Sequence, residues 1–207
     1  MVLPYKKVLT FFAHPDDETL AAGATLHRLS REGAHISVAI PNTGIHSRRN
    51  TQNSEKRHNA LENLQVDCFN ALSIYGVQQS DIFLGEFSDN EADRHTLLEL
   101  IHWFEKIVDQ VAIDAVIEIL QASFGDRLSQ AQAVRERFGK DESFHGSAPP
   151  DAVVTPYTTE EVSQIVKTCS DYQVPVIPYG TGTALEGHVA ALHGGISINM
   201  QEMNQIL

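Results

Sequence analysis

The sequence predicts an α/β protein whose first part contains a Rossmann-like parallel sheet. Short apolar runs rich in β-forming residues alternate with longer segments of helical periodicity between residues 7 and 87. The segment from 7 to 41 also has the strand, helix and strand of a βαβ unit, in which parallel pairing and a right-handed crossover are close to obligatory. The 207 residues suffice for one ordinary domain or two small ones.

Each element of the first half has its own signal. Residues 7–13 (KVLTFFA) predict a buried strand, and a helix follows at once, with Asp16 and Asp17 as N-cap oxygens and Gly33 as its stop. The later elements follow the same pattern: strand 35–41, helix 54–75, strand 81–87 and an amphipathic helix 97–111.

The alternation breaks after residue 111. The helical period continues to Phe124 where a fourth strand is expected, and a polar stretch rich in Gln and Arg follows. Residues 139–151 (GKDESFHGSAPPD) have the composition of a loop and are the best linker candidate. Beyond them we expect strands at 153–154, 174–177 and 196–199 and a helix at 159–172. The expected segments are therefore 1–110, a helical lead-in and linker over 111–150, and 151–207.

Composition excludes several classes of function. The formal net charge of -12 and the pI of about 5.2 argue against nucleic acid as a partner, because phosphate contacts need a basic surface. No segment is apolar for the roughly 20 residues of a membrane span, and the N-terminus lacks the pattern of a signal peptide. We therefore expect a cytoplasmic protein with Cys68 and Cys169 reduced in the core, and homo-oligomerisation is left open.

The run His14-Pro15-Asp16-Asp17 follows the first predicted strand, at the carboxyl edge of a parallel sheet, where α/β proteins place their ligands. Imidazole nitrogen and carboxylate oxygen are ligands that Zn²⁺ accepts, and a hydrolytic zinc uses three protein ligands and a water. His14 and Asp17 are candidates for two of the three, with Asp16 as general base. The alternative is structural: both aspartates cap the helix and His14 forms a local hydrogen bond.

The segment AHPDDETLAAGATLHRLSREG resembles the LmbE and PIG-L family of metal-dependent N-deacetylases, which act on N-acetylglucosaminyl and related N-acyl sugars. The resemblance continues through Asn42-Thr43-Gly44, Lys56-Arg57 and Phe87-Ser88-Asp89-Asn90, over about residues 5–110. It implies Zn²⁺ or another divalent metal on His14 and Asp17, a general base at Asp16, and contacts to a small N-acyl sugar from Arg57 and Asp93. A solvated helix face for Arg57 and a turn or cap for Asp93 are equally good interpretations.

The sequence also departs from this family. The family completes its site with a His-rich segment on and after a fourth strand, which supplies the third ligand and an oxyanion-stabilising imidazole. After Trp103 this chain has only His145, His188 and His193, and none follows a predicted fourth strand of the first segment. A site with two ligands holds zinc weakly, because affinity depends on the full ligand set. An active enzyme therefore needs a third ligand from His145, a water or a partner chain.

A glycine-rich loop over residues 180–187 can bind phosphate. Its glycines let backbone N–H groups approach oxygens closely, and Thr181 and Thr183 add hydroxyls. The spacing is not Gly-x-Gly-x-x-Gly, and no P-loop lysine follows, so the pattern alone also fits an ordinary loop.

The longer segment from about Ile113 to the last residue looks like the N-terminal part of the FAD-binding domain of D-lactate dehydrogenase and glycolate oxidase flavoproteins. That resemblance implies that the loop binds the FAD diphosphate, in a site that is incomplete because the family's domain continues beyond this point. The implied cofactor-binding residues are Gly180, Thr181, Gly182, Thr183 and Gly187.

We therefore expect a partial Rossmann-like, LmbE-type sheet followed by a truncated α+β FAD-binding subdomain, joined near residues 108–113. The leading functional hypothesis is a zinc-dependent N-deacetylase-like protein, impaired by loss of the third metal ligand. The alternatives are an FAD-binding module of an oxidoreductase and an inactive fused or truncated remnant. Reaction and substrate class come from resemblance, because a fold alone does not define them.

Overall fold

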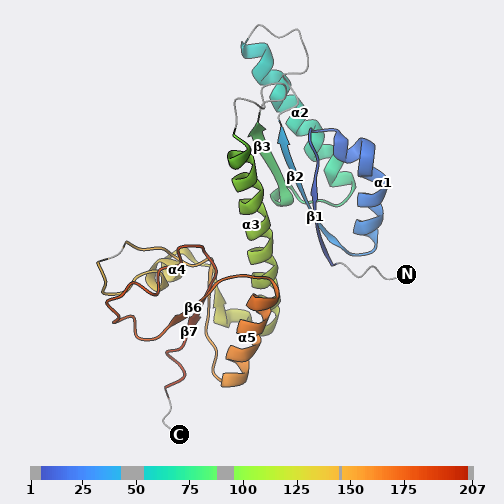
Figure 1. Ribbon diagram of the computed structural model, residues 1–207. Coiled ribbons are helices and arrows are strands. Elements are labelled where there is room, and N and C mark those ends of the chain that lie inside the picture. The colour runs from blue at the N-terminus through green and yellow to red at the C-terminus, as the bar shows by residue number, and fades with distance from the viewer. Residues whose placement is uncertain (1–5, 43–53, 88–95, 145, 205–207) are drawn as a thin grey trace. The chain divides into compact units, whose positions relative to one another are not determined.

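The computed structural model describes residues 6–42, 54–87, 96–144 and 146–204, and over 54–60 it describes the backbone alone. The chain divides into two compact units, Met1–Val108 and Asp109–Leu207, here called the N-terminal and C-terminal units. Each unit has its own sheet and its own hydrophobic core (Figure 1). The α/β fold class expected from the sequence is confirmed.

The N-terminal unit contains a three-stranded parallel sheet in the order β1-β2-β3. Helix α1 connects β1 to β2, and helix α2 lies between β2 and β3, because parallel strands need long crossover connections. The bounds of these elements are β1 Lys7–Phe11, α1 Asp17–Arg31, β2 His35–Asn42, α2 Ser54–Ile74, the 3-10 turn Gln79–Asp81 and β3 Ile82–Phe87.

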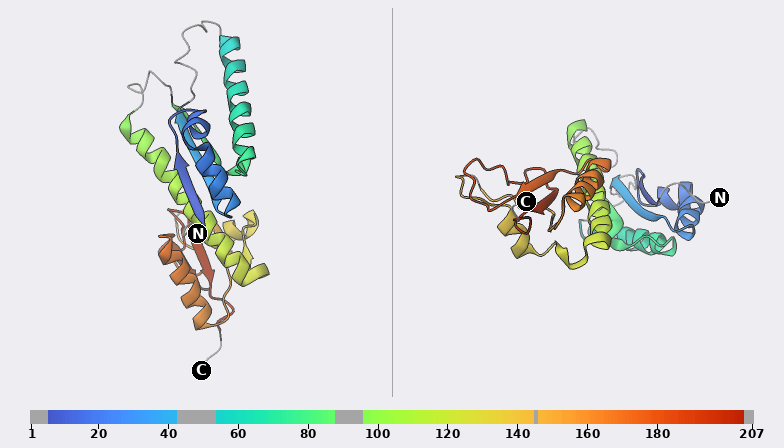
Figure 2. Two further views of the ribbon diagram at one scale, coloured as in Figure 1. Left: turned by 90° about the vertical axis from the view of Figure 1, so that its right-hand side faces the viewer. Right: turned by 90° about the horizontal axis from the view of Figure 1, so that it is seen from below.

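Helices cover both faces of this sheet (Figure 2). One face of β2 packs against α1 and α2, and the buried side chains of this core are Leu26, Ile36, Val38, Ile40, Cys68, Leu72 and Val77. On the other face, Phe11 of β1 contacts Phe104 of α3 (Leu97–Phe124) edge to face, with ring centroids 4.8 Å apart. The unit therefore has the three layers of a doubly wound α/β protein.

The C-terminal unit contains a second sheet, in the order β4-β5-β7-β6, in which only β4 is antiparallel. Its elements are the end of α3, β4 Leu128–Ser129, α4 Gln132–Phe138, β5 Ala152–Val154, α5 Thr159–Asp171, β6 Val176–Tyr179 and β7 Ile196–Asn199. Apolar side chains of α3 and α5 pack on one face of the sheet with Val154, Ile196 and Ile198.

The opposite face of this sheet is covered by chain that follows β6. Val189 and Ala191 pack with Val153, Ile177 and the ring of Tyr179, and Phe138 of α4 joins the same cluster. Val189 and Ala191 therefore cover part of this face.

Four elements differ from the sequence expectations. Helix α3 does not end at residue 111 as predicted. It continues through the helical period that follows, and so crosses the boundary between the units. Strand β4 and helix α4 lie in the polar stretch where we expected neither, because a few buried side chains such as Leu128 and Phe138 stabilise such short elements. Strand β6 begins at Val176, since the backbone N–H of Val174 donates to Cys169 O at the end of α5.

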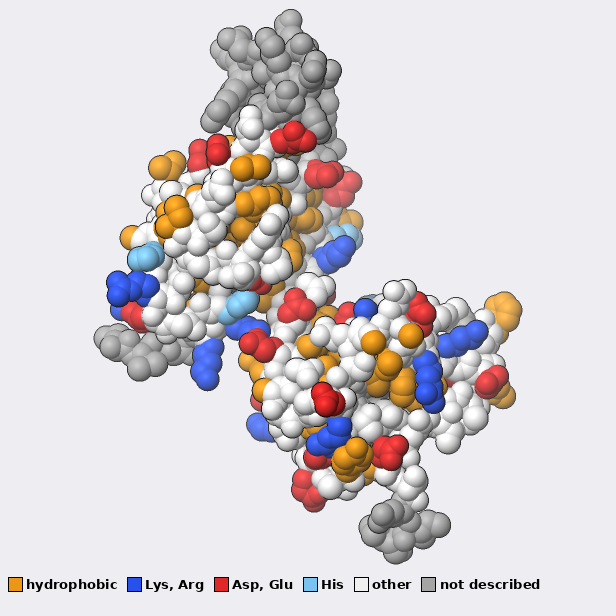
Figure 3. Space-filling model, turned by 180° about the vertical axis from the view of Figure 1, so that it is seen from behind, with side chains coloured by type: hydrophobic (Ala, Val, Ile, Leu, Met, Phe, Trp, Pro, Cys, Tyr) orange, Lys and Arg blue, Asp and Glu red, His pale blue; other side chains and the backbone are white. Residues whose placement is uncertain are grey.

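The charged side chains are mixed on the surface. On the face shown in Figure 3, Lys and Arg lie in small groups between acidic and uncharged side chains. Within the described ranges, no helix combines the length and apolar character needed to cross a membrane.

Candidate functional site

The predicted metal ligands His14 and Asp17 lie together where the chain leaves β1 and enters α1. Asp17 Oδ2 accepts a hydrogen bond from the backbone N–H of His14 at 3.1 Å and lies 3.4 Å from His14 Nδ1. The two side chains are 43% and 41% exposed, so both can be reached from solvent. The local turn therefore brings an imidazole and a carboxylate to the carboxyl end of β1.

The spacing of this pair fits two ligands of one zinc ion. Zinc ligands lie about 2.0–2.2 Å from the metal, so two ligands at tetrahedral angles are roughly 3.3–3.6 Å apart. The measured Nδ1 to Oδ2 distance of 3.4 Å falls in this interval. Among the residues that the structure describes, no group of three or more His, Cys, Asp and Glu side chains could hold a metal. Metal binding by His14 and Asp17 stays a prediction.

Asp16, the predicted general base, has a strained backbone. Its φ of 135° and ψ of -28° lie in a region that residues with a Cβ rarely adopt, and such residues cluster at functional sites. Asp16 occupies the N-cap position of α1, but its side chain makes no capping hydrogen bond. The expectation that both aspartates supply N-cap oxygens is therefore wrong: the Asp17 carboxylate accepts from His14 instead.

Glu18, to which the sequence analysis assigned no role, holds the strained turn in place. Its side chain is 1% exposed, Oε2 accepts from the backbone N–H of Asp16 at 2.9 Å, and Oε1 accepts from the Thr19 hydroxyl at 3.1 Å. A glutamate of the first helical turn thus accepts from the backbone N–H of the N-cap residue, as in a capping box. An acidic residue two positions after a predicted N-cap is the sequence signal that could have identified Glu18.

Asp16 also lines a cavity of about 350 Å³ between the start of α1 and helix α2, together with Asp67 and Cys68. Burial, followed by the charges of Glu18 and Asp16, raises the pKa of the Cys68 thiol to about 12. At neutral pH this thiol stays protonated, so Cys68 is a packing residue and not a nucleophile.

The other predicted residues of this site are outside the described side chains. Arg57 belongs to α2, but only its backbone is described. Asp93 and His145 lie outside the described residues. Their roles stay predictions.

The glycine-rich loop is fully described. Gly182 and Gly187 have φ values of 77° and 73°, and a Cβ on Gly182 would collide with the ring of Tyr179. Gly180 faces open space, and the exposed hydroxyls of Thr181 and Thr183 lie 2.9 Å apart. The loop therefore offers hydroxyls and closely approachable backbone to an anionic ligand.

This loop is hydrogen-bonded to the segment that we expected to be a linker. Asp141 Oδ2 accepts from the backbone N–H of Gly187 at 3.2 Å, and Oδ1 accepts from that of Ser143 at 3.0 Å. The Tyr179 hydroxyl donates to Lys140 O at 3.5 Å. Hydrogen bonds from the Ser143 side chain and from the backbones of Ser143 and Gly187 lower the pKa of Asp141.

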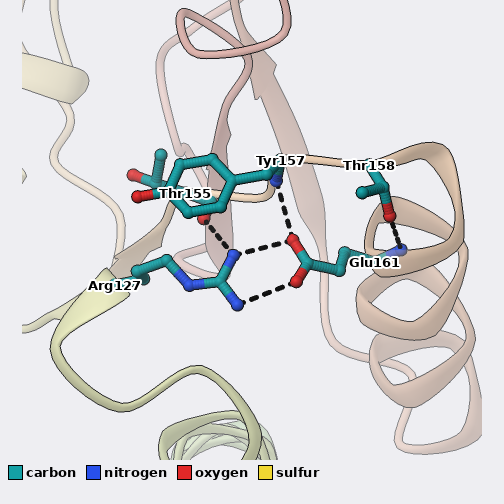
Figure 4. A network of polar contacts seen from close by, with 5 residues as sticks. All are labelled: Arg127, Thr155, Tyr157, Thr158 and Glu161. Carbon is teal, nitrogen blue, oxygen red and sulfur yellow. Dashed lines mark hydrogen bonds and ion pairs between the residues drawn. The ribbon is translucent and has the colours of Figure 1, made fainter.

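A second polar network joins the 3-10 turn Gly125–Arg127, directly before β4, to α5 (Figure 4). Arg127 forms two bonds to Glu161, of 2.7 and 2.8 Å, and its guanidinium lies 4.5 Å from the centroid of the Tyr157 ring. Glu161 also accepts from the backbone N–H of Tyr157 at 2.7 Å, while Thr158 caps the helix. Arg127 is the main cause that lowers the pKa of Glu161 to about 2. The sequence analysis missed this network because its partners are 34 residues apart.

The fold and site define a two-part α/β protein, with a His/Asp pair at a parallel sheet edge and a separate glycine loop. The family model of GlcNAc-PI de-N-acetylases (PIG-L) matches residues 9–136, and the model of an FAD-binding domain matches residues 150–207. The chain therefore belongs to the GlcNAc-PI de-N-acetylase family and ends in a segment of FAD-binding type. This confirms the two resemblances seen in the sequence.

Curated relatives match less than half of this chain. A probable mitochondrial D-lactate dehydrogenase of Danio rerio is 45% identical over 97 residues, which are 46% of this chain and 20% of the relative. The chain spans about a fifth of the length of the curated relatives that it matches.

Among solved structures, alkyldihydroxyacetonephosphate synthase is 27% identical with a TM-score of 0.42, covering 45% of this chain and 21% of that one. The N,N'-diacetylchitobiose deacetylase of Pyrococcus horikoshii is 21% identical with a TM-score of 0.38, covering 59% of this chain and 39% of that one.

Proposed function

We propose that this chain is a metal-dependent N-deacetylase-like protein that acts weakly on N-acyl sugars. The observation that carries the proposal is the approach of His14 Nδ1 to Asp17 Oδ2, at 3.4 Å, at the carboxyl end of β1. Membership of the deacetylase family supports the reaction class, hydrolysis of an acetamide. The sugar substrate and the zinc ion are part of the proposal.

In this proposal His14 and Asp17 hold a zinc ion. Zinc at such a site polarises a carbonyl and makes a bound water more acidic. Asp16 takes the proton of the attacking water, while the Glu18 carboxylate holds the Asp16 backbone in position. Arg57 and Asp93 contact the sugar. Because two side chains bind zinc less tightly than three, we expect low affinity and slow turnover.

The test measures zinc binding and acetate release from N-acetylglucosamine derivatives with the full chain. We expect His14→Ala to abolish both. His27→Ala, which removes an exposed histidine from helix α1 that follows the site, should leave both unchanged. Asp16→Asn should keep zinc binding and lose acetate release.

If the wild-type chain binds no more zinc than His14→Ala and releases no acetate in excess zinc, the proposal is wrong. The N-terminal unit would then be an inactive remnant of its family.

The second candidate function is FAD binding by the C-terminal unit. It is favoured by the glycine loop, where Gly182 and Gly187 have positive φ, Gly180 faces open space and two threonine hydroxyls are exposed. These residues fit the diphosphate end of FAD, and the family match over 150–207 supports that ligand. FAD, when bound, supplies redox chemistry. The proposal for this chain concerns binding only.

Flavin binding has a visible signal. Protein reconstituted with FAD and then desalted should stay yellow, and Gly182→Ala should be colourless because a Cβ there meets the Tyr179 ring. Gly146→Ala is the matched control, since a Cβ at Gly146 meets open space. Colourless wild-type protein would rule out this candidate.

A further inference from the structure

Asp141 stands out among the acidic residues of the C-terminal unit. It is 8% exposed and lies in the segment of loop composition, 46 residues before the glycine that it contacts. Its two carboxylate oxygens accept from different backbone N–H groups, those of Ser143 and Gly187. One side chain thus joins a tight turn in its own segment to the far end of the glycine loop.

We propose that Asp141 is a positioning residue that fixes the Gly187 end of the glycine loop for binding of a diphosphate. The identity of the ligand rests on the second candidate function, FAD binding. Gly187 has a φ of 73° and no side chain to hold it, so the loop needs a contact from outside to keep one conformation. The Asp141 carboxylate provides that contact.

Two further contacts between the same segments support this role. At the other end of the loop, Gly182 packs on the Tyr179 ring, whose hydroxyl donates to Lys140 O. Beyond the loop, Asp151 Oδ2 accepts from the backbone N–H of Gly195 at 2.6 Å. Hydrogen bonds therefore join residues 140–151 to the chain from 179 to 195 at several places, and the Asp141 contact lies between those of Lys140 and Asp151.

Asp141 acts through the loop and not as a ligand. A carboxylate repels a diphosphate, and both Asp141 oxygens are already engaged with backbone N–H groups. The groups left for the ligand are the exposed hydroxyls of Thr181 and Thr183 and the backbone around Gly180.

The test uses the full chain and three variants: Asp141→Ala, Asp141→Asn and Glu142→Gln. Glu142 is the matched control, because it is the neighbouring carboxylate and is exposed. Two quantities are measured: amide hydrogen exchange at Gly187 without ligand, and the affinity for ADP and for FAD. We expect Asp141→Ala to speed Gly187 exchange and to weaken ADP binding, each about tenfold, as for loss of one charge-assisted hydrogen bond.

The conservative variant separates positioning from folding. Asp141→Asn keeps one carbonyl oxygen as acceptor, so it should show intermediate exchange and affinity with an unchanged melting temperature. Glu142→Gln should match wild type in every measurement. If Asp141→Ala does not fold, Asp141→Asn carries the test.

Unchanged Gly187 exchange in the Asp141 variants would overturn the proposal, as would an equal loss of ADP affinity in Glu142→Gln. Wild-type protein that binds neither ADP nor FAD would instead overturn the flavin candidate. In that case Gly187 exchange alone decides whether Asp141 holds the loop.

Discussion

At the scale of the residue, Asp16 combines an unfavourable backbone with a side chain that does not cap its helix. Its φ is 135°, and its carboxylate forms no capping bond. A strained non-glycine conformation costs about 1–3 kcal/mol and persists only where surrounding contacts hold it. Here the buried Glu18 carboxylate provides that contact by accepting from the Asp16 N–H. Strained residues of this kind cluster at functional sites.

Replacing Asp16 by glycine should therefore stabilise the protein. Glycine adopts positive φ freely but loses more entropy on folding, so we expect Asp16→Gly to raise the free energy of unfolding by about 1 kcal/mol. Asp16→Ala keeps the strain and loses no capping bond, so it should be close to neutral. Urea denaturation measures both. A less stable Asp16→Gly would show that the side chain stabilises the turn.

Glu161, a second single residue, makes the stability of the C-terminal unit depend on pH. Its pKa is lowered from 4.5 to about 2, mainly by its hydrogen bonds from Arg127. A carboxyl with a lower pKa in the folded state contributes stability that is complete above about 4.5 and is lost as the pH falls through about 2. The wild-type C-terminal unit should therefore lose stability between pH 4.5 and 2.

Glu161→Gln should be less stable than wild type at pH 7, and the difference should shrink towards pH 2. The matched control is Glu160→Gln, which removes an exposed carboxylate from the same first turn of α5. Urea denaturation at a series of pH values compares the three proteins. If Glu160→Gln shows the same pH dependence as Glu161→Gln, the effect belongs to the helix dipole and not to the Arg127 pair.

At the scale of the element, strands β2 and β3 approach each other unusually closely at Gly85. A Cβ at this position would lie 2.5 Å from Pro41 O and 2.9 Å from Pro41 Cα. The register of the pair shifts between Ile40 and Asn42, directly beside the contact. A glycine inside a strand marks such a close backbone approach. The contact fixes how closely β3 approaches β2 near the carboxyl edge of the sheet.

Gly85→Ala should lower the free energy of unfolding of the N-terminal unit by about 1–3 kcal/mol, because backbone must move to accept the methyl group. Gly146→Ala, where a Cβ meets open space, is the control and should be neutral. Thermal denaturation measures the difference. An unaffected Gly85→Ala would mean that the strand pair adjusts without cost.

Helix α3 is the other decisive element. Phe104, in its first half, contacts Phe11 of β1, while Leu120, in its second half, is fully buried in the core of the C-terminal unit. One uninterrupted helical period thus serves two cores. The junction expected near 108–113 falls inside the helix, and the two units meet at residue 108 without any break in secondary structure.

At the scale of the whole molecule, the protein has two separate sheets and separate cores, so we expect two unfolding transitions. Leu72 and Leu120 are both fully buried, one in each core. Leu72→Ala should lower only the transition of the N-terminal unit, and Leu120→Ala only that of the C-terminal unit, each by about 2–5 kcal/mol. Denaturation followed by Trp103 fluorescence, which reports the N-terminal unit, and by circular dichroism distinguishes them. A single transition shifted by both variants would show that the units unfold together.

Most elements could be predicted because they depend on local pattern. Short apolar runs predict the strands and a period of 3.6 predicts α1, α2 and α5, and both signals are properties of neighbouring residues. The exceptions are β4 and α4, which are two and seven residues long. Elements of this length have too few residues for a periodic signal and form because Leu128 and Phe138 are buried by distant parts of the chain.

The sequence by itself determined the α/β class, both family resemblances, the His14 and Asp17 pair and the glycine loop, because these depend on contiguous residues. The tertiary structure decided the rest. It showed that Asp16 is strained and caps nothing, that the expected linker supports the loop through Asp141, and that Arg127 pairs with Glu161. Each of these depends on contacts between atoms or on a backbone angle, and neither composition nor spacing encodes those quantities.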